Sequence, residues 1–411
     1  MSAILTGVKT IREHWKKSIL FSVLAYYGVD YLKDKFETNE LMRVYCEEAV
    51  RFGNETTSVL ETPRNITVIL NPSANKAKAK VQFEKYCAPI LHLAGLSVNV
   101  ILTESEGHAK RILEKLDQTE AVVIGGGDGT VSEVITGLLR RCNNDASQNH
   151  VPVGVLPLGR SNTLAASLFP GGDKLSVVRS LADATMAVVK QNTKPIDLMK
   201  IEVQDDTNSK PVYAVNEIEW GVFRDARAVQ DKYWYFGKLR NYATYIFNAS
   251  QINSPYEATL VYSLPCPGCK NCKNVISNSE NKWWKSLFGR STSKQEAIQY
   301  VNVNPQCNQL IEKDVATTSI SLRTTNTMDE SNVDVPQLCI NVGPDKIDYI
   351  DFVKQGVSQQ PQIIDKVAAR QVQLKPGIPE SEEELSIDNE SFELKPITVT
   401  LLPKAIKVFT K

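Results

Sequence analysis

Four glycines surround one aspartate within the sequence AVVIGGGDGTVSE, which spans Ala121–Glu133. Glycines let backbone amides come close to an anion, and the positive end of a following helix favours the same negative charge. A carboxylate in such a loop repels phosphate unless it holds a metal ion or takes a proton from a nucleophile. Asp128 therefore points to phosphoryl-transfer chemistry, although an ordinary glycine-rich turn is the alternative interpretation.

The segments beside the loop indicate how it is held. Ala121–Ile124 is a short apolar run typical of a buried strand, and apolar residues recur at helical spacing from Thr130 onward. The loop therefore joins a strand to a helix. It lacks the Lys-Ser/Thr ending of a Walker loop and the spacing of the dinucleotide-binding motif, so neither common glycine fingerprint applies.

Further apolar runs alternate with helical patterns before residue 194 and predict a parallel sheet with ligands at the carboxyl ends of its strands. Two other loops at that edge carry residues suited to phosphate, NPS at Asn71–Ser73 and LPLGRSN at Leu156–Asn162. The predicted strands are Ile66–Leu70, Leu96–Leu102, Ala121–Ile124 and Val153–Pro157.

From about Lys194 the pattern changes to many short alternating segments with little helix between them. This pattern predicts a second, mainly antiparallel, β-sandwich-like domain. The fold class expected is therefore an α/β nucleotide-binding domain followed by a β-rich domain. The predicted divisions are 1–60 for anchor and linker helices, 61–193 for the α/β domain, and 194–411 for the β-rich domain with a polar loop inserted at 264–298.

The N-terminal segment resembles an organelle-targeting sequence, because its basic residues outnumber its single acid before residue 18. Ser18–Val29 then contains no charge, but it is shorter than the roughly 20 residues of a spanning helix. An interfacial helix or a short signal-anchor is favoured, with Trp15 in the headgroup zone. A helix packed on its own domain is the alternative.

Composition limits the possible functions. The chain has 411 residues, a formal net charge of zero and an ordinary globular balance of apolar and charged residues. The balanced charge argues against a nucleic-acid partner. Eight cysteines are too few for a disulfide scaffold at this length.

Cysteines and tryptophans mark the inserted loop. Cys266, Cys269 and Cys272 stand at two-residue spacing, and Cys307 or Cys339 would supply a fourth zinc ligand. Unligated or disulfide-bonded cysteines are the favoured interpretation, with zinc as the alternative. In NKWWKSLFGR, aromatic residues interleave with basic ones, which favours membrane contact over a buried cluster. The two aromatic residues expected at the membrane are Trp283 and Trp284.

Four motifs in order, NPSANK, GGGDGT, LPLGRSN and SIDNESFE, resemble the lipid kinase family of sphingosine kinases, ceramide kinase and bacterial diacylglycerol kinases. The block WGVFRDARAVQDKYWYFGKLR at Trp220–Arg240 restricts the resemblance to one branch of this family. So do FEKYCAPILHLAGL at Phe83–Leu96 and HWKK at His14–Lys17. Together these segments resemble the acylglycerol kinases over nearly the whole chain.

The resemblance implies transfer of the γ-phosphate of ATP, with Mg²⁺, to the hydroxyl of monoacylglycerol or diacylglycerol. It implies that Asp128 is the base or the carboxylate that arranges hydroxyl and magnesium. Glu133, one helical turn on, is a candidate helper acid that orients Asp128, and an exposed first-turn acid favoured by the helix dipole is the equal alternative. Asp225 and Asp388 would also be catalytic, although a capping or salt-bridged acid is an equal alternative for both. The implied nucleotide-binding residues are Asn71, Ser73, Thr103, Gly126, Gly127, Gly129, Thr130, Gly159, Asn162, Arg240 and Glu390.

The chain departs from the family pattern in three places. The first loop reads Ser-Ala where many relatives have Ser-Gly, and Arg160-Ser161 stands where they have a small residue and glycine. Asn389 replaces the glycine of the late Asp-Gly-Glu motif. These departures all fall in the loops expected to bind the nucleotide.

The resemblance also implies a location and partners. It places the chain at the mitochondrial inner membrane, facing the intermembrane space, and in the translocase that imports carrier proteins. Its lipid partners would be acylglycerols. Phosphorylation of ceramide or sphingosine is the alternative activity, and a translocase scaffold with little catalysis is the alternative role.

Overall fold

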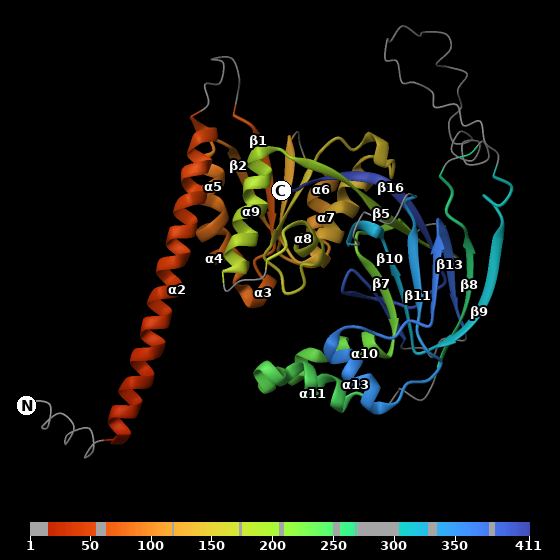
Figure 1. Ribbon diagram of the computed structural model, residues 1–411. Helices are drawn as coiled ribbons and strands as arrows, with labels where there is room; N and C mark the ends of the chain where they lie inside the picture. The colour runs from red at the N-terminus through yellow and green to blue at the C-terminus, as the bar shows by residue number, and fades with distance from the viewer. Residues whose placement is uncertain are drawn as a thin grey trace, which may run out of the picture.

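The computed structural model shows a long N-terminal helix, an α/β domain and a β-rich domain (Figure 1). The residues described by the structure are 15–54, 63–116, 119–171, 175–204, 209–249, 255–267, 269, 304–327, 335–377 and 383–411. Trp283, Trp284 and Cys272 lie outside these residues, as does most of the predicted inserted loop.

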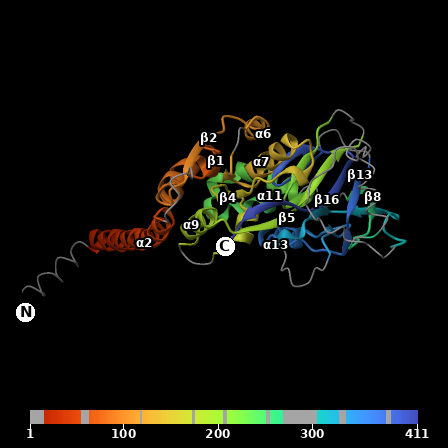
Figure 2. The same ribbon diagram turned by 90° about the horizontal axis from the view of Figure 1, so that it is seen from above.

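Helix α2 (Trp15–Gly53) is 39 residues long and includes the charge-free segment. Its C-terminal half packs on the α/β domain, where Tyr45 donates a hydrogen bond of 2.6 Å to Asp183 and Ala49 is fully buried. Its N-terminal half projects past the body in both views (Figures 1 and 2). Among the described residues, no helix combines the length and the apolar character needed to cross a membrane.

Four parallel strands form the α/β domain, in the order β2-β1-β3-β4. They are β1 (Asn65–Leu70), β2 (Ser97–Leu102), β3 (Ala121–Gly126) and β4 (Val153–Pro157). The register places Leu70 opposite Gly125, so the loops that follow β1 and β3 meet at one edge. The predicted parallel sheet is confirmed.

Helices cover this sheet because its strands are apolar on both faces, with β3 buried along its whole length. The helices and turns of the domain are α3 (Ala74–Ala77), α4 (Ala79–Gln82), η1 (Phe83–Cys87), α5 (Ala88–Leu93), α6 (His108–Glu114), α7 (Asp128–Arg141), η2 (Ala146–Gln148), α8 (Thr163–Leu168) and α9 (Ser176–Lys190).

The β-rich domain consists of antiparallel strands in two layers, which confirms the predicted antiparallel character. One layer continues the first sheet through β5 (Thr193–Val203), β6 (Val212–Ala214), β8 (Tyr256–Ser263), β9 (Leu310–Thr317), β13 (Gln371–Pro376) and β16 (Ile397–Phe409). The other layer is β12-β11-β10-β7-β14-β15. Its strands are β7 (Glu217–Gly221), β10 (Ser319–Arg323), β11 (Leu338–Val342), β12 (Asp365–Ala369), β14 (Glu384–Ile387) and β15 (Glu390–Glu393). An apolar cluster with members from both layers fills the space between them.

Strand β16 joins the two domains into one ten-stranded sheet. Val399, near its start, lies in the core of the β-rich domain, whereas Phe409, at its end, lies in the core of the α/β domain. Val408 pairs in parallel with Val153 of β4. The predicted divisions at 60, 193 and 264–298 stay predictions, and the sequence patterns gave no sign of this shared sheet.

Three helices and a 3-10 segment pack together beside the six-stranded layer (Figure 1). They are α10 (Val222–Ala228), η3 (Gln230–Leu239), α11 (Arg240–Phe247) and α13 (Tyr349–Ser358). A separate short turn, η4, spans Thr325–Thr327. Phe223, Tyr245 and Phe352 form their aromatic centre, with Phe223 and Phe352 stacked at 5.2 Å between ring centroids. This helical group lines one side of a cleft between the two domains.

Candidate active site

The glycine-rich loop lies where β3 ends and α7 begins, as its strand-loop-helix pattern predicts. Gly127 precedes the first turn of α7, and its carbonyl accepts a hydrogen bond of 3.1 Å from the Val131 N–H. A Cβ atom added to Gly159 would lie 2.2 Å from Cα of Gly127, so the two loops touch backbone to backbone. Glycine at both positions therefore permits this contact, and any larger residue must separate the loops.

The loop after β1 contacts the same helix. Asn71 donates from its side-chain amide to the Thr130 hydroxyl at 3.3 Å and from its backbone N–H to the Gly125 carbonyl at 2.9 Å. Asn75 and Lys76 follow with positive φ angles of 50° and 58°, a conformation rare for residues other than glycine. Such turns leave amides that bind anions, and Lys76 adds a cation.

These three loops enclose a cleft of about 400 Å³ on the α/β domain, which we call the nucleotide-side cleft. Its lining contains these predicted nucleotide-binding residues: Asn71, Ser73, Gly127, Gly129, Thr130, Gly159 and Glu390. Other predicted residues stand behind the lining. Thr103 donates its backbone N–H to the Leu70 carbonyl, and Asn162 exchanges two hydrogen bonds of 2.9 Å with the backbone of Gly159. A Cβ on Gly126 would meet the Thr130 side chain.

Asp128 is only 2% exposed, and side chains from both domains hold its carboxylate. The Ser161 hydroxyl donates to it at 2.5 Å, and the backbone N–H and hydroxyl of Thr163 donate at 2.8 and 2.9 Å. From the β-rich domain, the amides of Asn216 and Asn389 donate to it at 3.3 Å each. Asp128 therefore lies at the contact between the domains with a fixed orientation.

Asp388 organises the part of this contact that comes from the β-rich domain. It is 1% exposed, and its carboxylate accepts hydrogen bonds of 2.8 to 3.1 Å from the backbone N–H groups of Val215, Asn216 and Glu217. Burial outweighs these bonds and raises the pKa of Asp388 to about 6. With both oxygens occupied by backbone, Asp388 acts on Asp128 through Asn216, and its catalytic role stays a prediction.

The turn between β14 and β15 presents Asn389. Asp388 and Asn389 both have positive φ angles, 47° and 68°, as the two central residues of a tight hairpin turn require. Asparagine tolerates this conformation nearly as glycine does, so the fold permits the departure from Asp-Gly-Glu. Its side chain then reaches Asp128 and, at 2.9 Å, the Ser161 hydroxyl.

Two further predicted acids contact other groups. Glu133 accepts a hydrogen bond of 2.9 Å from the Gly107 N–H, which ties α7 to the turn before α6. Asp225 accepts hydrogen bonds from the Tyr256 hydroxyl at 2.6 Å and from Arg224 at 3.0 Å. The helper role of Glu133 and the catalytic role of Asp225 stay predictions, and the structure gives both acids a partner other than Asp128.

A second and larger cleft of about 800 Å³ opens on the other side of Asp128, between the domains. We call it the acceptor-side cleft. It shares Gly127, Gly129 and Arg160 with the nucleotide-side cleft. Five arginines line it, whereas the carboxylates in its lining are only three. The arginines are Arg160, Arg224, Arg227, Arg240 and Arg323.

The arginines are fixed by acids of the β-rich domain. Arg323 of β10 binds Glu217 at 2.6 Å, and Arg227 of α10 binds Glu219 at 2.8 Å. Both acids lie on β7. Burial and the charge of Glu219 raise the pKa of Glu217 to about 8 despite Arg323. Arg160 reaches across the cleft to Asp231 at 2.6 Å, and Arg240 approaches the same acid at 3.4 Å. Guanidinium groups held in this way suit phosphate oxygens.

Magnesium fits one of two candidate carboxylates better than the other. The oxygens of Asp128 already accept the donors described above, so they offer few free lone pairs to an ion. Glu390 lies against Gly129, where a Cβ would come within 2.2 Å of its Oε1 atom. Burial and the negative charges of Glu133 and Glu106 raise the pKa of Glu390 to about 7. A hard divalent cation near Glu390 would offset this repulsion, and carboxylate oxygen is the donor that Mg²⁺ prefers.

Sequence reasoning missed most of the acceptor-side cleft. Asn216 and Arg323 carry no local motif, so nothing near them in sequence signals their role. Arg227 lies within the block Trp220–Arg240, but the residues singled out there were Asp225 and Arg240. Arg160 and Asn389 were notable in the sequence only because they depart from the family pattern. This departure was the one signal that could have identified them as site residues.

Two family models match the chain in sequence. One, described as the diacylglycerol kinase catalytic domain, matches residues 65–201, and one described as the acylglycerol kinase C-terminal region matches residues 215–411. Mitochondrial acylglycerol kinase of Xenopus laevis is 34% identical over 99% of this chain and 95% of its own length. The chain belongs to the acylglycerol kinase family. The human mitochondrial acylglycerol kinase is likewise 34% identical, over 98% of this chain and 95% of its own length.

The more distant comparisons agree with this family. Human sphingosine kinase 1 is 30% identical over 44% of this chain and 47% of its own length. A putative diacylglycerol kinase from Bacillus anthracis shares the fold, with a TM-score of 0.52 and 17% identity over 85% of this chain and 99% of that structure. This member of the acylglycerol kinase family is therefore a lipid kinase that uses ATP, which confirms the predicted enzyme class.

Proposed function

We propose that this lipid kinase transfers the γ-phosphate of ATP to a hydroxyl of monoacylglycerol or diacylglycerol, giving lysophosphatidate or phosphatidate. The observation that carries the proposal is the position of Asp128. It lies buried where the nucleotide-side cleft meets the acceptor-side cleft, beside the glycines common to both. The names of the two acylglycerol kinases, similar over nearly their full length, support the acceptor class.

Asp128 accepts the proton of the lipid hydroxyl in this proposal. The lipid oxygen forms a bond to the γ-phosphorus, the bond from that phosphorus to the bridging oxygen breaks, and ADP leaves with the electron pair. The lipid hydroxyl takes the place of the Ser161 hydroxyl, which donates to Asp128 at 2.5 Å, so the carboxylate has an acceptor position for it. Asn216 and Asn389 fix its orientation, so it needs little reorganisation when the lipid arrives.

We assign the magnesium ion to the nucleotide-side cleft, with Glu390 as its protein ligand rather than Asp128. When bound, magnesium supplies neutralisation of phosphate charge during transfer. Glu390 is the carboxylate of this cleft whose pKa is raised by burial and by its acidic neighbours, so a cation relieves a repulsion that the fold itself creates. Asp128 stays available for the hydroxyl proton.

The acceptor-side cleft accommodates the headgroup. Its arginines offset the charge of the phosphate being transferred, and Glu217 and Glu219 accept hydrogen bonds that place Arg323 and Arg227. The polar lining suits glycerol hydroxyls, whereas Phe223 and Tyr245 supply an apolar surface for the start of an acyl chain.

Exposed aromatic and aliphatic side chains flank the mouth of this cleft, and we propose that they face the membrane from which the lipid is drawn. We call them the apolar ridge. Trp234 is 72% exposed, and η3 and α11 also supply the cleft residues Gln230, Arg240 and Tyr245. The members of the ridge are Trp234, Tyr235, Leu239, Tyr242 and Phe247. Aromatic residues of this kind favour the headgroup zone of a bilayer.

Helix α2 supports the same orientation. Its N-terminal end, with the exposed Trp15, lies toward the side of the molecule where α10, α11 and α13 also lie (Figure 1). One membrane surface can therefore contact both. Membrane contact by Trp15 remains part of the proposal, as do the inner membrane and its intermembrane-space face. The printed names of the relatives support the mitochondrial location.

Flotation with liposomes tests the ridge. Replacing Trp234 and Leu239 together by serine is expected to weaken binding at least about tenfold, because burial of a large apolar side chain is worth about 1.5–3 kcal/mol. Val177→Ser provides the matched control, since Val177 is also exposed but lies on α9. Equal binding by the double variant and the control would remove the ridge from the proposal.

A role in carrier-protein import is a second proposal, which rests on the family resemblance. It does not require catalysis, so Asp128→Asn separates it from the kinase activity. Import that continues in mitochondria carrying Asp128→Asn, but fails when the whole chain is removed, supports the second role. Import that fails in both cases to the same degree contradicts a catalysis-independent role.

The acceptor itself is tested by supplying monoacylglycerol, diacylglycerol, ceramide and sphingosine separately in micelles to the purified chain. We expect kcat/KM to be highest for the two acylglycerols. A higher value for ceramide or sphingosine would contradict the acceptor assignment while leaving the lipid kinase class in place.

A further inference from the structure

Three cysteines meet at the base of the connection between β8 and β9. Cys266 and Cys269 follow the end of β8, and Cys307 precedes the start of β9. These two strands pair in antiparallel register with Ser263 opposite Leu310, so the sheet brings the two ends of the connection together. The cysteines therefore stand where the chain leaves the sheet and where it returns.

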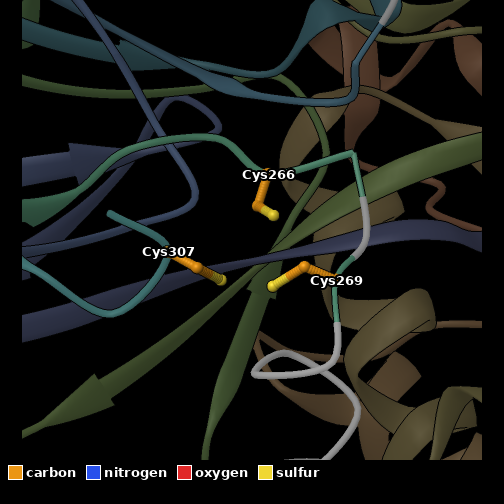
Figure 3. A group of neighbouring side chains, drawn as sticks. All are labelled: Cys266, Cys269 and Cys307. Carbon is orange, nitrogen blue, oxygen red and sulfur yellow. The ribbon is translucent and has the colours of Figure 1, made fainter. Parts of the chain in front are cut away.

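The three sulfur atoms lie within 4.8 Å of one another and point into one common space (Figure 3). Zinc bound to thiolates at about 2.3 Å in a tetrahedral arrangement separates the sulfurs by about 3.8 Å. The observed spacing therefore needs a shift of about 1 Å at most to accept the ion. A disulfide would engage only two of the three sulfurs, whereas one metal ion engages all of them.

Hydrogen-bond donors surround these sulfur atoms, two of which are buried. Cys269 and Cys307 are each 1% exposed. Arg370 donates a hydrogen bond of 3.5 Å to the Cys307 sulfur and one of 3.3 Å to its carbonyl, and the Asn304 amide donates to the Cys266 sulfur at 3.6 Å. Three thiolates exceed the charge of a divalent ion by one negative charge, which the Arg370 guanidinium balances. Donors that contact the ligands of a metal in this way also fix their orientation.

The sheet holds this arrangement in place. The backbone N–H of Arg370, which links β12 to β13, donates to the Ser263 carbonyl at 2.9 Å. Cys339 lies instead on β11 in the other layer, so Cys307 is the cysteine that joins Cys266 and Cys269. None of these three cysteines belongs to the lining of the acceptor-side cleft.

We propose that Cys266, Cys269 and Cys307 bind a structural zinc ion that closes the base of the β8–β9 connection. Thiolate sulfur favours zinc over the harder magnesium and calcium ions. Among the described residues, no fourth cysteine, histidine or carboxylate joins the group. The grouping reverses the interpretation favoured by sequence alone, in which the thiols were unligated or disulfide-bonded.

Metal analysis of the purified full-length chain tests this proposal. We expect about one zinc ion per chain in wild type, and less than about a tenth of that in Cys307→Ser, because the loss of one thiolate weakens such a site strongly. Cys142→Ser is the matched control, a cysteine on another part of the surface, and should keep its zinc. Wild-type protein without zinc, or Cys307→Ser with undiminished zinc, would overturn the proposal.

A second measurement covers the case in which Cys307→Ser does not fold. Wild-type protein is stripped with a chelator and titrated with Co²⁺, which gives intense near-ultraviolet absorption when thiolates bind it. We expect this absorption to saturate at about one equivalent and zinc to abolish it. Its absence in reduced, folded protein would overturn the proposal. A native mass lower by two hydrogens, with the bond mapped to two of these cysteines, would replace the ion by a disulfide.

Discussion

The nucleotide-side wall and the acceptor-side wall of the active site are lined by different kinds of group. On the nucleotide side, backbone atoms of Gly127 and Gly159 lie against each other and form part of the cleft lining. On the acceptor side, paired charges such as Arg227 with Glu219 form the lining. A wall made of backbone is sensitive to added volume, whereas a wall made of charges is sensitive to altered charge. The variants below test this difference.

Gly159→Ala is expected to have the largest effect on the nucleotide side. The new Cβ would lie 2.2 Å from Cα of Gly127, and neither backbone can move aside alone. We expect kcat/KM to fall at least about a hundredfold, because misplacement of reacting groups by about 1 Å costs this much. The unfolding free energy should fall by about 1–3 kcal/mol.

Gly28→Ala is the control for Gly159→Ala. A Cβ at Gly28 meets nothing within 4 Å, and the residue lies within helix α2. This control should be slightly more stable than wild type and equally active. Denaturant unfolding and lipid phosphorylation are measured for both variants. If Gly159→Ala matches Gly28→Ala in activity, the contact between the loops is not needed.

Glu390→Gln tests the magnesium assignment. Below about pH 7, Glu390 of the free enzyme binds a proton, and above it the carboxylate is available to the cation. We expect the concentration of Mg²⁺ needed for half-maximal activity to fall in wild type as pH rises through 7. The variant should need about tenfold more Mg²⁺ at pH 8, without this trend. Glu393→Gln, on the same strand, is the control; a wild-type response in Glu390→Gln would exclude Glu390 as the ligand.

The same residue makes a prediction for stability without nucleotide and metal. The pKa of Glu390 is raised on folding, so the folded state binds more protons than the unfolded state between about pH 4.5 and 7. Its contribution to the unfolding free energy is present below this range and is lost as pH rises through 7. Thermal unfolding of wild type should show a steeper decline than Glu390→Gln over this range. Parallel pH profiles would show that Glu390 titrates normally.

Arg160→Ala should have a smaller effect that separates recognition from stability. Arg160 borders both clefts, and its pair with Asp231 is largely exposed. We expect kcat/KM to fall about tenfold and the unfolding free energy to change by less than about 1 kcal/mol. Asp231→Asn breaks the same pair but keeps the arginine, so its activity should stay within about threefold of wild type. Equal losses in both variants would mean that the ion pair, and not the cation, matters.

Ser161→Ala is expected to have the smallest effect. The variant removes one of five groups that donate to Asp128, and the amides of Asn216 and Asn389 remain. We expect kcat to fall about two- to threefold, the cost of about half a kcal/mol. A loss beyond about a hundredfold would indicate that the serine carries the proton itself.

The nucleotide side was largely predictable because its signals are local. The run from Ala121 to Glu133 contains strand, glycines, carboxylate and helix in sequence order, and the structure places them as β3, the loop and α7. The acceptor side was not predictable in this way. Asn389 contacts Asp128 across 261 positions, and that contact depends on the way β16 joins the two domains. Long-range pairing of this kind leaves no periodic signal near either residue.

The loop also gained a sharper interpretation from the structure. From the sequence alone, Asp128 could hold magnesium or accept a proton, and Glu133 was the residue predicted to orient it. In the structure, Ser161, Thr163 and two asparagines donate hydrogen bonds to Asp128, and the Gly107 N–H donates to Glu133. Glu390 lies beside the phosphate loop. We therefore propose that the two tasks are divided between Asp128 and Glu390, on the basis of contacts that only the folded chain shows.

Asp128→Asn gives the most direct test of the proposed chemistry. Asparagine keeps the size of the side chain but cannot accept the lipid proton. With ATP, Mg²⁺ and monoacylglycerol or diacylglycerol in micelles, we expect kcat to fall at least about a hundredfold while ATP binding is kept. Phosphorylation of the lipid by folded Asp128→Asn at the wild-type rate would contradict the account.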